Sequence, residues 1–583
     1  MKIKDAERLS GLSAKTIRYY ESKGLLDVMR GSNSYREYSE ADVGLLRQIR
    51  RLRCLGIAVA DIRLWRDGVV SSRELVMKRR SELEADGRLG MELRDVCERI
   101  LDGRESLDCI DGRLTAMLDD EAGVAGEPCP EGSLALGVDI GTTSISAQLV
   151  SLETGLPVHT YNFDHNASIE VEGYRNAFAS DAETLVERTV GLVRSALHSY
   201  PNIASIGFSG QMHGIVCLDE NMKILSPLYT WQNRFGELSD DRGGRICDAF
   251  EELTGESVPT GYGFVTLFAL RRLGLLPEGT RHIATIADAA AARLCGAAAP
   301  LLHPTMAASF GLYDIDGRRF SDSAREISAE VFVPEISADY GILGYIESDS
   351  RKIPVSVAIG DNQAGVFGSL KSDDMLLVNI GTSGQVSFIG EGNSGGGVEY
   401  RPYFDGKKLL SGSILCGGRA FAALADLVAD AVSSFAQKPS RRDIYAYLNR
   451  LAEEPLSDPL SITTTFSGTR AEPSVRGAIN GISLLNFDMR HLADGILRGI
   501  IDELYTLFVR MAGADVHPQI VVSGNAMRRC TALRHIAAER FGCEPLLPKH
   551  VEESAYGAAL FAAISAGHIT RAKAGELIAY DER

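Results

Sequence analysis

The sequence predicts a multidomain protein with an N-terminal all-α module of the winged helix-turn-helix type, a dimerisation helix, and two α/β lobes. Three observations support this fold class. Basic residues are concentrated in the first 80 residues, two short helical segments joined by a glycine turn begin the chain, and one strand–turn–strand motif recurs after an interval of 240 residues. A motif that recurs at this spacing indicates two related lobes.

Composition places the chain among ordinary globular proteins. Of its 583 residues, 45% are hydrophobic and 24% are charged. No run of about 18 apolar residues is present, and the start MKIKDAERLS lacks the apolar core of a signal peptide, so we expect a cytoplasmic protein without a membrane partner. The ten cysteines form no CxxC pair, which is typical of reduced thiols. A sensor built from Cys97, Cys109 and Cys129 is the alternative, although their spacing matches no metal-site pattern.

Charge is distributed very unevenly along the chain. Residues 1–80 carry 18 Lys and Arg against 10 Asp and Glu, whereas the remaining residues carry 43 against 68, within a total net charge of −17. A basic segment attached to an acidic body predicts a polyanionic partner for the first segment only.

The first 30 residues read as two helices joined by a tight turn. An apolar helical pattern covers Ile3–Leu9, Ser13 is placed to cap a second helix over Ala14–Ser22, and Gly24 closes that helix. Two short helices with this connection predict a helix-turn-helix.

The second helix and the segment after it carry residues suited to DNA contact. Arginine and threonine reach base edges or phosphates, and tyrosine reaches the sugar-phosphate backbone. A turn between short extended runs at residues 31–38 is typical of a wing, and further helices are predicted from Ser39 and Ala58. The candidate DNA-binding residues are Lys15, Thr16, Arg18, Tyr19 and Tyr20 on the helix, and Tyr35 and Arg36 on the wing.

Residues 71–120 are charged and helix-prone, with an approximate apolar stripe. Gly87, Gly90 and Gly103 weaken the prediction of one long helix, because each costs about 1 kcal/mol relative to alanine. Two or three shorter helices are therefore the alternative. The acidic stretch that follows is rich in Gly and Pro and indicates a linker over residues 121–133.

Three motifs in the N-terminal region resemble the MerR family of regulators. They are T-I-R-Y-Y-E-x-x-G-L-L at Thr16–Leu26, Y-R-x-Y-S-E-A-D at Tyr35–Asp42, and L-R-x-L-G-I at Leu52–Ile57. The resemblance implies a winged helix-turn-helix over residues 1–70 that binds promoter DNA, and a homodimer formed through an antiparallel pair of helices from residues 71–120. The alternative is a basic helical domain that binds another ligand.

The repeated motif is an apolar strand, a turn of Gly, Thr and Ser, and a second strand. It occupies residues 136–144 and returns in altered form at residues 376–384, with Asn379 at the position of Asp139. Such a turn offers backbone N–H groups and short hydroxyl donors to a phosphate. Two turns, one per lobe, are suited to hold a nucleotide from both sides.

Three other segments mark strand-to-helix junctions. Residues 359–364 follow an apolar strand and read I-G-D-N-Q-A, and residues 520–526 form a buried strand that breaks at a glycine. Residues 552–559 begin a helix of small side chains, which we expect to pack closely against a flat ligand.

From residue 134 to about residue 570, the motifs D-I-G-T-T-S, S-G-Q-M-H-G, T-W-Q-N-R, G-D-N-Q-A, N-I-G-T-S-G and S-G-N-A resemble the FGGY carbohydrate kinases. The resemblance implies the actin/hexokinase/Hsp70 (ribonuclease H-like) ATPase fold, with a sugar-binding lobe over 134–368 and a nucleotide-binding lobe over 369–583. The S-G-Q-M-H-G motif is similar to ketose kinases, and T-W-Q-N-R with G-D-N-Q favours sedoheptulokinase-like over xylulokinase-like members.

The family resemblance assigns roles to particular residues, with ATP and Mg²⁺ as cofactors. Asp361 is the base that accepts the proton of the sugar hydroxyl, and Asp139 is associated with Mg²⁺ through water. Without that resemblance, Asp361 reads as a helix N-cap and Asp139 as a turn carboxylate bonded to backbone N–H groups. The remaining residues expected to bind the nucleotide are Gly141, Thr142, Thr143, Gly381, Thr382, Ser383, Gly524 and Asn525.

The family resemblance also assigns the residues expected to bind the sugar. His213 is expected to donate to a sugar hydroxyl, Met212 to pack on the carbon face and Trp231 to offer its ring; the alternatives are a structural histidine and a core tryptophan. Asn233 stands where relatives carry an acidic residue, so its role is open. The expected substrate-binding residues are Gln211, Met212, His213, Trp231, Asn233 and Asp361.

These readings combine into one prediction, an ATP-dependent ketose kinase whose MerR-type module binds promoter DNA as a dimer. One rival is a non-catalytic regulator that uses the kinase lobes to sense sugar. Asp361, Asp139 and residues 381–383 are all present, which favours an enzyme. A second rival is an enzyme whose N-terminal module only dimerises, and the basic charge of that module argues against it.

Overall fold

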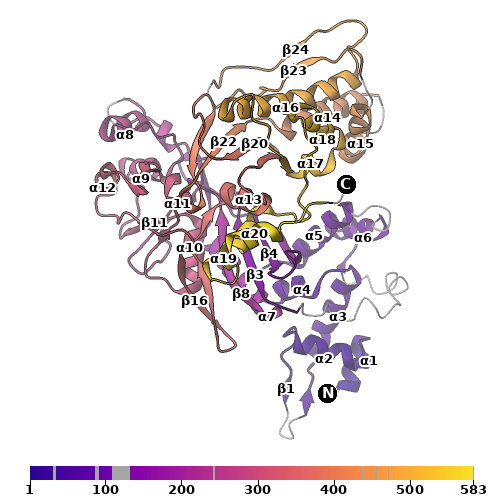
Figure 1. The fold of residues 1–583 in the computed structure, drawn as a ribbon. Coiled ribbons are helices and arrows are strands. Elements are labelled where there is room, and N and C mark those ends of the chain that lie inside the picture. Colours follow the sequence, from indigo (N-terminus) through magenta and orange to yellow (C-terminus); the bar gives the residue numbers. More distant parts are fainter. Residues whose placement is uncertain are drawn as a thin grey trace.

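The computed structural model describes residues 1–30, 35–85, 91–107, 131–240, 243–435, 437, 439–453, 456–470 and 472–581. The chain forms a helical N-terminal module and two α/β lobes that follow one another in sequence (Figure 1). Within the part of the chain that is described, no helix has the length and apolarity to cross a membrane.

The N-terminal module begins with the helices that the capping residues predict. Ser13 accepts the N–H of Thr16 at the start of the second helix, and Ser39 accepts the N–H of Asp42 at the start of the third. The predicted boundaries at Ser39 and Ala58 are the N-caps of α3 and α4. The elements are α1 (Ile3–Ser10), α2 (Ala14–Ser22), β1 (Met29–Arg30), β2 (Arg36–Glu37), α3 (Glu40–Cys54) and α4 (Val59–Arg66), with β1 and β2 paired antiparallel.

The predicted dimerisation region contains two helices, α5 (Ser72–Ala85) and α6 (Met91–Leu101), which pack against each other. Gly87 and Gly90 belong to the interval between these two helices, which lies outside the described residues. Leu75, Val76 and Leu83 of α5 are buried within this single chain. The predicted linker, apart from residues 131–133, and Cys109 and Cys129 lie outside the described residues.

The first lobe is built on a sheet whose central strand carries the first repeat. The sheet has the order β16-β17-β8-β3-β4-β5, with β18 also paired to β8. Strand β3 runs antiparallel to β4 and parallel to β8, so its carboxyl end meets the end of β8 at one edge. The strands are β3 (Leu134–Ile140), β4 (Ser144–Ser151), β5 (Pro157–Asp164), β8 (Ile203–Gly210), β16 (Ile342–Ser348), β17 (Arg351–Ser356) and β18 (Ile359–Gly360).

Helices α7 (Ala182–Ser199) and α10 (Ile286–Cys295) pack together, and α10 also contacts this sheet. An additional layer with its own apolar core includes the hairpin β6 (Ser168–Val171) and β7 (Tyr174–Ser180), strands β9 (Val216–Leu218), β10 (Leu228–Tyr229) and β11 (His282–Ala284), and helices α8 (Ile246–Thr254), α9 (Gly263–Arg272) and α12 (Asp322–Ser328). Helix α11 (Pro304–Ala307) precedes that last helix.

The second lobe repeats the strand–turn–strand unit in a sheet of order β21-β22-β20-β19-β25. Helices α14, α15, α16 and α18 form the core with one face of this sheet. The strands are β19 (Leu376–Ile380), β20 (Gly384–Ile389), β21 (Val398–Pro402), β22 (Lys408–Ile414) and β25 (Ile520–Ser523), and the helices are α14 (Gly418–Ser433), α15 (Arg441–Ala452), α16 (Met489–Ala512), α17 (Asn525–Arg529) and α18 (Thr531–Phe541). A small hairpin, β23 (Ser461–Thr463) and β24 (Ala478–Asn480), lies outside this sheet.

Two helices connect the lobes at their centre, α13 (Asp361–Ser369) and α19 (Glu553–Ser565), and α20 (Arg571–Leu577) follows (Figure 1). The small residues of α19 allow close packing on protein. A Cβ atom on Gly137 of β3 would lie 1.9 Å from the carbonyl oxygen of Ala555, and one on Gly557 would lie 1.9 Å from that of Ala364. The expectation that this helix packs against a flat ligand is therefore wrong, because its small side chains admit strand β3 and helix α13.

The N-terminal module packs directly against the first lobe. Helix α4 packs against α7, and α5 packs against β5 (Figure 1). The Lys78 ammonium of α5 donates to both carboxylate oxygens of Asp61 at 2.8 Å and to the carbonyl of Thr160 in β5 at 3.0 Å, and His159 lies 3.2 Å from Asp61. Burial alone would raise the pKa of Asp61, but His159 and Lys78 outweigh it and hold that pKa at about 2.

A second polar contact joins α5 to α7. Arg188 donates to Glu74 at 2.6 Å through one nitrogen and to the carbonyl of His165 at 3.1 Å through another. The backbone N–H of His165 in turn donates to the carbonyl of Thr143 at 3.1 Å, within the first Gly/Thr turn. Helix α5 is thus connected by hydrogen bonds to the turn predicted to hold phosphate.

Candidate functional site

The first phosphate turn closes the hairpin of β3 and β4. The N–H of Gly141 donates to the carbonyl of Ser144 at 3.0 Å, and Thr143 is exposed. The side-chain amide of Gln211 donates to the carbonyl of Gly141 at 3.2 Å, and the indole N–H of Trp231 donates to the Thr142 hydroxyl at 3.0 Å. Two predicted sugar residues therefore contact the predicted phosphate turn.

In the second phosphate turn, between β19 and β20, a similar backbone hydrogen bond closes a loop that is one residue shorter. The N–H of Gly381 donates to the carbonyl of Ser383 at 3.0 Å, and Thr382 and Ser383 are exposed. No atom lies within 4 Å of a Cβ built on Gly381, so the turn is open on that side. Both turns thus present hydroxyl groups and unobstructed backbone.

Two glycines that the sequence reasoning missed support the second turn. Gly417 is the N-cap of α14 and Gly418 is its first residue, and they donate their N–H groups to the carbonyls of Thr382 at 3.1 Å and Gly381 at 2.8 Å. A Cβ atom on Gly417 would lie 2.4 Å from the carbonyl oxygen of Ser383, so a larger residue does not fit there. The signal available in the sequence was the pair of adjacent glycines directly after a strand.

Asp361 and Asp139 come together where the lobes meet. Asp361 is the first residue of α13, after the N-cap Gly360, and its Oδ1 accepts the N–H of Asn362 at 2.7 Å. Asp139 ends β3 and accepts the Ser209 hydroxyl at 2.7 Å. Asp361 is thus the first helical residue and not the N-cap that the alternative reading expected.

The two carboxyl groups have raised pKa values for related reasons. Burial raises the pKa of Asp139 to about 7, with further contributions from the negative charges of Asp361 and Glu552. Burial raises the pKa of Asp361 to about 6 against the opposing effect of hydrogen bonding to Asn362 and the charge of Arg401. A buried pair of this kind is stabilised by a cation or a proton.

The start of α19 ties both aspartates to one element. The Ser554 hydroxyl donates to the backbone carbonyl of Asp361 at 3.0 Å, and the Ser554 carbonyl lies 3.3 Å from the Ser209 hydroxyl that binds Asp139. Glu552 has a left-handed backbone with φ of 59° and accepts the Asn162 amide of β5 at 2.6 Å. These contacts fix the aspartates relative to each other and to the first lobe.

Met212 lies beside the start of α13, and His213 follows it in the chain. The Met212 sulfur is 2.8 Å from a Cβ built on Gly360, so this side chain packs against the residue before the base. His213 has φ of 72°, its ring lies 4.2 Å from that of Tyr262, and its Nδ1 is 3.2 Å from the Ser309 carbonyl. Burial and the charge of Arg401 lower the pKa of His213 to about 3, so the ring is neutral.

That hydrogen bond decides which role His213 can take. A carbonyl only accepts, so Nδ1 carries the proton and donates it to Ser309, and Nε2 is left as an acceptor. The expectation that His213 donates to a sugar hydroxyl is therefore replaced by one in which it accepts from that hydroxyl.

Trp231 and Asn233 differ in their surroundings. Trp231 is 45% exposed, so it is not a core residue and its ring is available to a ligand. Asn233 is only 1% exposed; its Nδ2 donates to the carbonyl of Ala177 at 2.7 Å, and its Oδ1 accepts the N–H of Phe235 at 2.9 Å. Asn233 thus holds the loop in place from behind, and the prediction of direct sugar contact does not fit its position.

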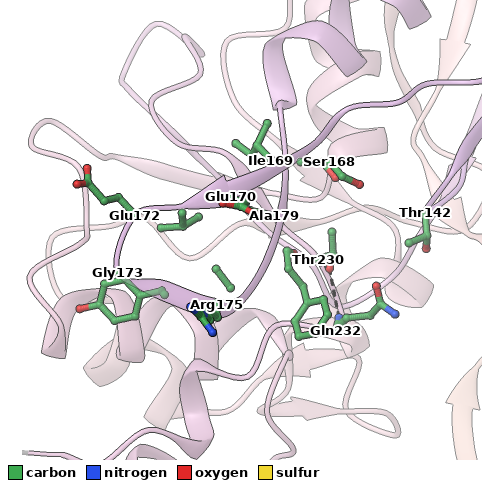
Figure 2. Close-up of a pocket in the computed structure, with 15 residues that line it drawn as sticks. Thr142, Ser168, Ile169, Glu170, Glu172, Gly173, Arg175, Ala179, Thr230 and Gln232 are labelled. Carbon is green, nitrogen blue, oxygen red and sulfur yellow. Dashed lines mark hydrogen bonds between the residues drawn. The ribbon is translucent and has the colours of Figure 1, made fainter.

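A cavity of about 820 Å³ opens beside the first turn (Figure 2). The hairpin β6–β7 forms most of its wall, and Thr142, Thr230 and Gln232 bring the phosphate turn and the Trp231 segment to its edge. Asp361 and His213 are not among its lining residues. We therefore define the site by the two turns and the paired aspartates, and the cavity adjoins it.

The predicted nucleotide residues at the end of β25 also lie beside the second hairpin. Gly524 has φ of 87°, and a Cβ there would lie 2.4 Å from the Ile380 carbonyl oxygen, so glycine is required. Asn525 begins α17 and is exposed. The residue before them, Ser523, has no left-handed backbone, so its position does not require glycine.

The predicted DNA-binding residues fall into two groups. Lys15 and Arg18 are exposed on α2, and Tyr35 is 73% exposed. Tyr20 is 1% exposed and belongs to the core, so the prediction that it contacts DNA is wrong. Tyr19 is half-buried, the Thr16 hydroxyl bonds Ser13 at 2.8 Å, and Arg36 is paired with Glu21 at 2.6 Å.

The residues present fit a nucleotide and a divalent cation. Asp139 and Asp361 are both buried, the charge of Asp361 contributes to the raised pKa of Asp139, and the two turns expose Thr143, Thr382 and Ser383. Among the described residues, no group of three or more His, Cys, Asp or Glu forms a metal cage. This donor set suits Mg²⁺ that keeps most of its ligands as water and phosphate oxygens. The eight cysteines in the described ranges are free thiols.

Comparison with known proteins agrees with this division of the chain. Residues 1–68 match the MerR HTH family of regulatory proteins, and residues 134–368 match the N-terminal domain of the FGGY family of carbohydrate kinases. Sedoheptulokinase of Mus musculus is 25% identical over 469 residues, covering 73% of this chain and 96% of that protein. The HTH-type transcriptional regulator HmrR of Rhizobium leguminosarum bv. viciae is 37% identical over 119 residues, covering 19% of this chain and 92% of the regulator.

Among solved structures, the xylulose kinase from Rhodospirillum rubrum superposes with a TM-score of 0.64 at 20% identity, covering 77% of this chain and 93% of that structure. This likeness shows that the two lobes have the sugar-kinase fold. The kinase family model covers residues 134–368, the relatives and solved structures extend the likeness across both lobes, and the MerR model covers the N-terminal helices. The chain is a carbohydrate kinase of the FGGY family joined to an N-terminal module of the MerR family.

Proposed function

We propose that this protein phosphorylates a ketose with ATP, and that its N-terminal module binds promoter DNA. The observation that carries the first part is the placement of Asp361 and Asp139 between the two phosphate turns. A non-catalytic sugar sensor needs neither an aspartate at the acceptor position nor two intact turns, so the enzyme is the better reading.

The residues of the chain divide the work of phosphoryl transfer. Asp361 accepts the proton of the attacking hydroxyl, and its raised pKa of about 6 leaves it ionised at neutral pH. The second turn, Gly381–Ser383, holds the transferred phosphoryl group, and Asp139 with Gly141–Thr143 faces the nucleotide phosphates. Bound Mg²⁺ would supply neutralisation of the developing phosphate charge, with Asp139 as its protein-side carboxylate.

On the sugar, Nε2 of His213 accepts from one hydroxyl and the exposed Trp231 ring covers a carbon face. A site built from such groups discriminates against acceptors that lack the matching hydroxyls. We therefore compare kcat/KM for sedoheptulose, xylulose, ribulose, gluconate and glycerol with ATP. We expect one of the ketoses to exceed glycerol by at least about 10²-fold, and a preference for glycerol would contradict the ketose assignment.

For the N-terminal module, we propose a winged helix-turn-helix in which α2 and the β1–β2 hairpin face DNA. Lys15, Arg18 and Tyr35 are the exposed candidates that remain after Tyr20 and Arg36 are accounted for within the module. We expect Arg18→Ala to weaken promoter binding by the full chain, with a salt slope of about −0.9 per phosphate contacted. Arg442→Ala, an exposed arginine of α15, is the control.

We further propose that ligand binding in the lobes changes DNA binding. This proposal is supported by the packing of α5 against the first lobe. There, Lys78, Glu74 and Arg188 connect the module to β5 and the first turn. Coupling between two sites is reciprocal, typically about 1–3 kcal/mol. Sugar with a non-hydrolysable ATP analogue should change operator affinity by the same factor by which operator DNA changes sugar affinity.

Glu74→Gln weakens the connection without touching either site, so we expect it to reduce this coupling factor while both affinities measured alone stay the same. Glu183→Gln, which breaks an arginine pair within the first lobe, should leave the coupling unchanged. Equal operator affinities with and without ligands in the wild-type chain would show that the two functions are independent. A homodimer through α5 would require surface other than the buried Leu75, Val76 and Leu83.

A further inference from the structure

Three charged side chains of the second lobe form a cluster next to Asp361. Glu399 and Arg401 lie on β21; Arg401 donates to one oxygen of Glu399 at 3.1 Å, and Arg470 donates to the other at 3.2 Å. The Arg401 side chain is only 11% exposed. A guanidinium buried to this extent is costly unless it is paired and bonded on all sides, so its further partners are informative.

The further partner of Arg401 is Asn362, the residue directly after Asp361. One nitrogen of Arg401 donates to Oδ1 of Asn362 at 3.1 Å, while Nδ2 of Asn362 donates to Gln385 at 2.8 Å. Gln385 lies on β20, two residues after the second phosphate turn, and donates to the Ser411 hydroxyl at 2.7 Å. Both ends of the Asn362 amide are thus held by the lobe that carries this turn.

We propose that Arg401 is a positioning residue for phosphoryl transfer, which acts through Asn362 to fix Asp361 in register with the second phosphate turn. This inference rests on the proposed kinase function. The backbone N–H of Asn362 bonds the Asp361 carboxylate at 2.7 Å, so a shift of Asn362 moves the base. Arg401, Glu399 and Arg470 come from the second lobe, whereas His213 and Met212 come from the first.

The geometry requires an arginine. Its planar fork donates in two directions at once, to Asn362 and to Glu399, and a lysine ammonium on a flexible stem does not hold both partners in one plane. The charge of Arg401 also opposes the rise in the pKa of Asp361. The neighbouring Asp139 is affected by the charges of Asp361 and Glu552, both acidic.

The test uses the full-length chain with Arg401→Lys and Arg401→Met, and Arg441→Lys as the control. Arg441 is an exposed arginine of α15 paired with Asp426. Because misplacement of a catalytic group by about 1 Å costs about 10²-fold, we expect kcat to fall by about that factor in both Arg401 variants. The KM values for ketose and ATP and the rate of the control should stay close to wild type. An unchanged kcat in Arg401→Lys and Arg401→Met would overturn the proposal.

A double-mutant cycle identifies the route. If Arg401 acts through Asn362, the pair Arg401→Met and Asn362→Ala should lose no more kcat than Asn362→Ala alone. Losses that multiply would show that Arg401 acts by another route and would also overturn the proposal. Arg401→Lys keeps the charge and the stem, so it remains a usable variant if Arg401→Met fails to fold.

Hydrogen exchange separates this proposal from the kinase assignment. In the ligand-free chain, we expect faster exchange over residues 359–369 in Arg401→Met and unchanged exchange in Arg441→Lys. This readout needs no turnover, so it tests the contact even if no ketose is phosphorylated. Unchanged exchange in Arg401→Met contradicts the positioning role, whereas a wild-type chain that phosphorylates no sugar contradicts the proposed function.

Discussion

The two phosphate hairpins share one pattern of strand pairing, but the second turn is one residue shorter and Asn379 stands at the position of Asp139. Strand β3 pairs antiparallel with β4 and parallel with β8, and β19 pairs antiparallel with β20 and parallel with β25. In the first hairpin, Asp139 lies opposite Ser209 and accepts its hydroxyl at 2.7 Å; in the second, Asn379 lies opposite Ser523 and donates to its hydroxyl at 2.7 Å.

A serine hydroxyl both donates and accepts, so the same geometry holds a carboxylate in one lobe and an amide in the other. The difference is therefore one of charge and not of shape. The first hairpin contributes the negative charge that suits a cation, and the second offers neutral groups to the phosphate. Ser523 is the partner of Asn379.

The largest expected effect on kcat comes from replacing Asp361, which the proposed mechanism places between the two hairpins. Asp361→Asn should lower kcat by about 10²–10⁴-fold, because the base is lost. In the wild type, kcat/KM should fall as the pH drops below about 6, because the carboxyl group becomes protonated there. A steady-state pH profile measures both, and an Asp361→Asn variant with wild-type turnover would remove Asp361 from the mechanism. DNA binding by this variant is the control for folding.

Asp139→Asn makes the first hairpin resemble the second. We expect a loss of about 10²–10³-fold in kcat, the usual effect of removing one group that stabilises transition-state charge, and a higher Mg²⁺ requirement. The folded-state pKa of Asp139 is raised from 3.8 to about 7, so its ionised form destabilises the ligand-free fold above pH 7. At pH 8, the free energy of unfolding of the variant should therefore be about 1–3 kcal/mol higher than that of the wild type. Denaturant titration tests this, and lower stability would contradict the burial argument.

Asn379→Asp makes the converse change. Ser523 can reverse its hydrogen bond, so the free energy of unfolding should change little, but a second carboxylate beside the phosphate should lower kcat/KM for ATP about tenfold, or roughly 1.4 kcal/mol. Asn379→Ser, which adds no charge, is the matched control. If both variants lose the same activity, the charge difference between the hairpins has no catalytic meaning.

The smallest effects are expected from the two serines. Ser209→Ala removes a hydrogen bond to a carboxylate, worth about 2 kcal/mol, and Ser523→Ala removes one to an amide, worth about 1 kcal/mol. The difference in the free energy of unfolding should appear at pH 8 and shrink at pH 5, where Asp139 is protonated. Equal losses at both pH values would show that the two hairpins do not differ in charge.

Local sequence patterns were sufficient to predict several helix starts and both Gly/Thr hairpins of this protein. Capping at Ser13 and Ser39 and the alternation of apolar strands with Gly/Thr turns depend on neighbouring residues, so the helix starts and both hairpins were predicted correctly. The difference between Asp139 and Asn379 was also visible, because the repeat aligns them.

Long-range packing decided which side chains are exposed and able to bind a ligand. Tyr20 and Asn233 have the chemistry of binding residues but are buried by segments distant in sequence, and the tautomer of His213 depends on the carbonyl of Ser309, 96 residues away. The small residues of α19 face protein for the same reason. No local pattern reports such contacts.

The position of the N-terminal module against the first lobe was likewise decided by tertiary structure. The sequence predicted a tether and an apolar dimerisation stripe, whereas Leu75, Val76 and Leu83 of that stripe are buried within the chain, and Lys78 bonds Asp61 and Thr160. Amphipathic periodicity shows that a helix has an apolar face but does not say what covers it. Here α5 packs against α6, α4 and β5 of the same chain, and the Lys78 ammonium is met by Asp61 and the Thr160 carbonyl.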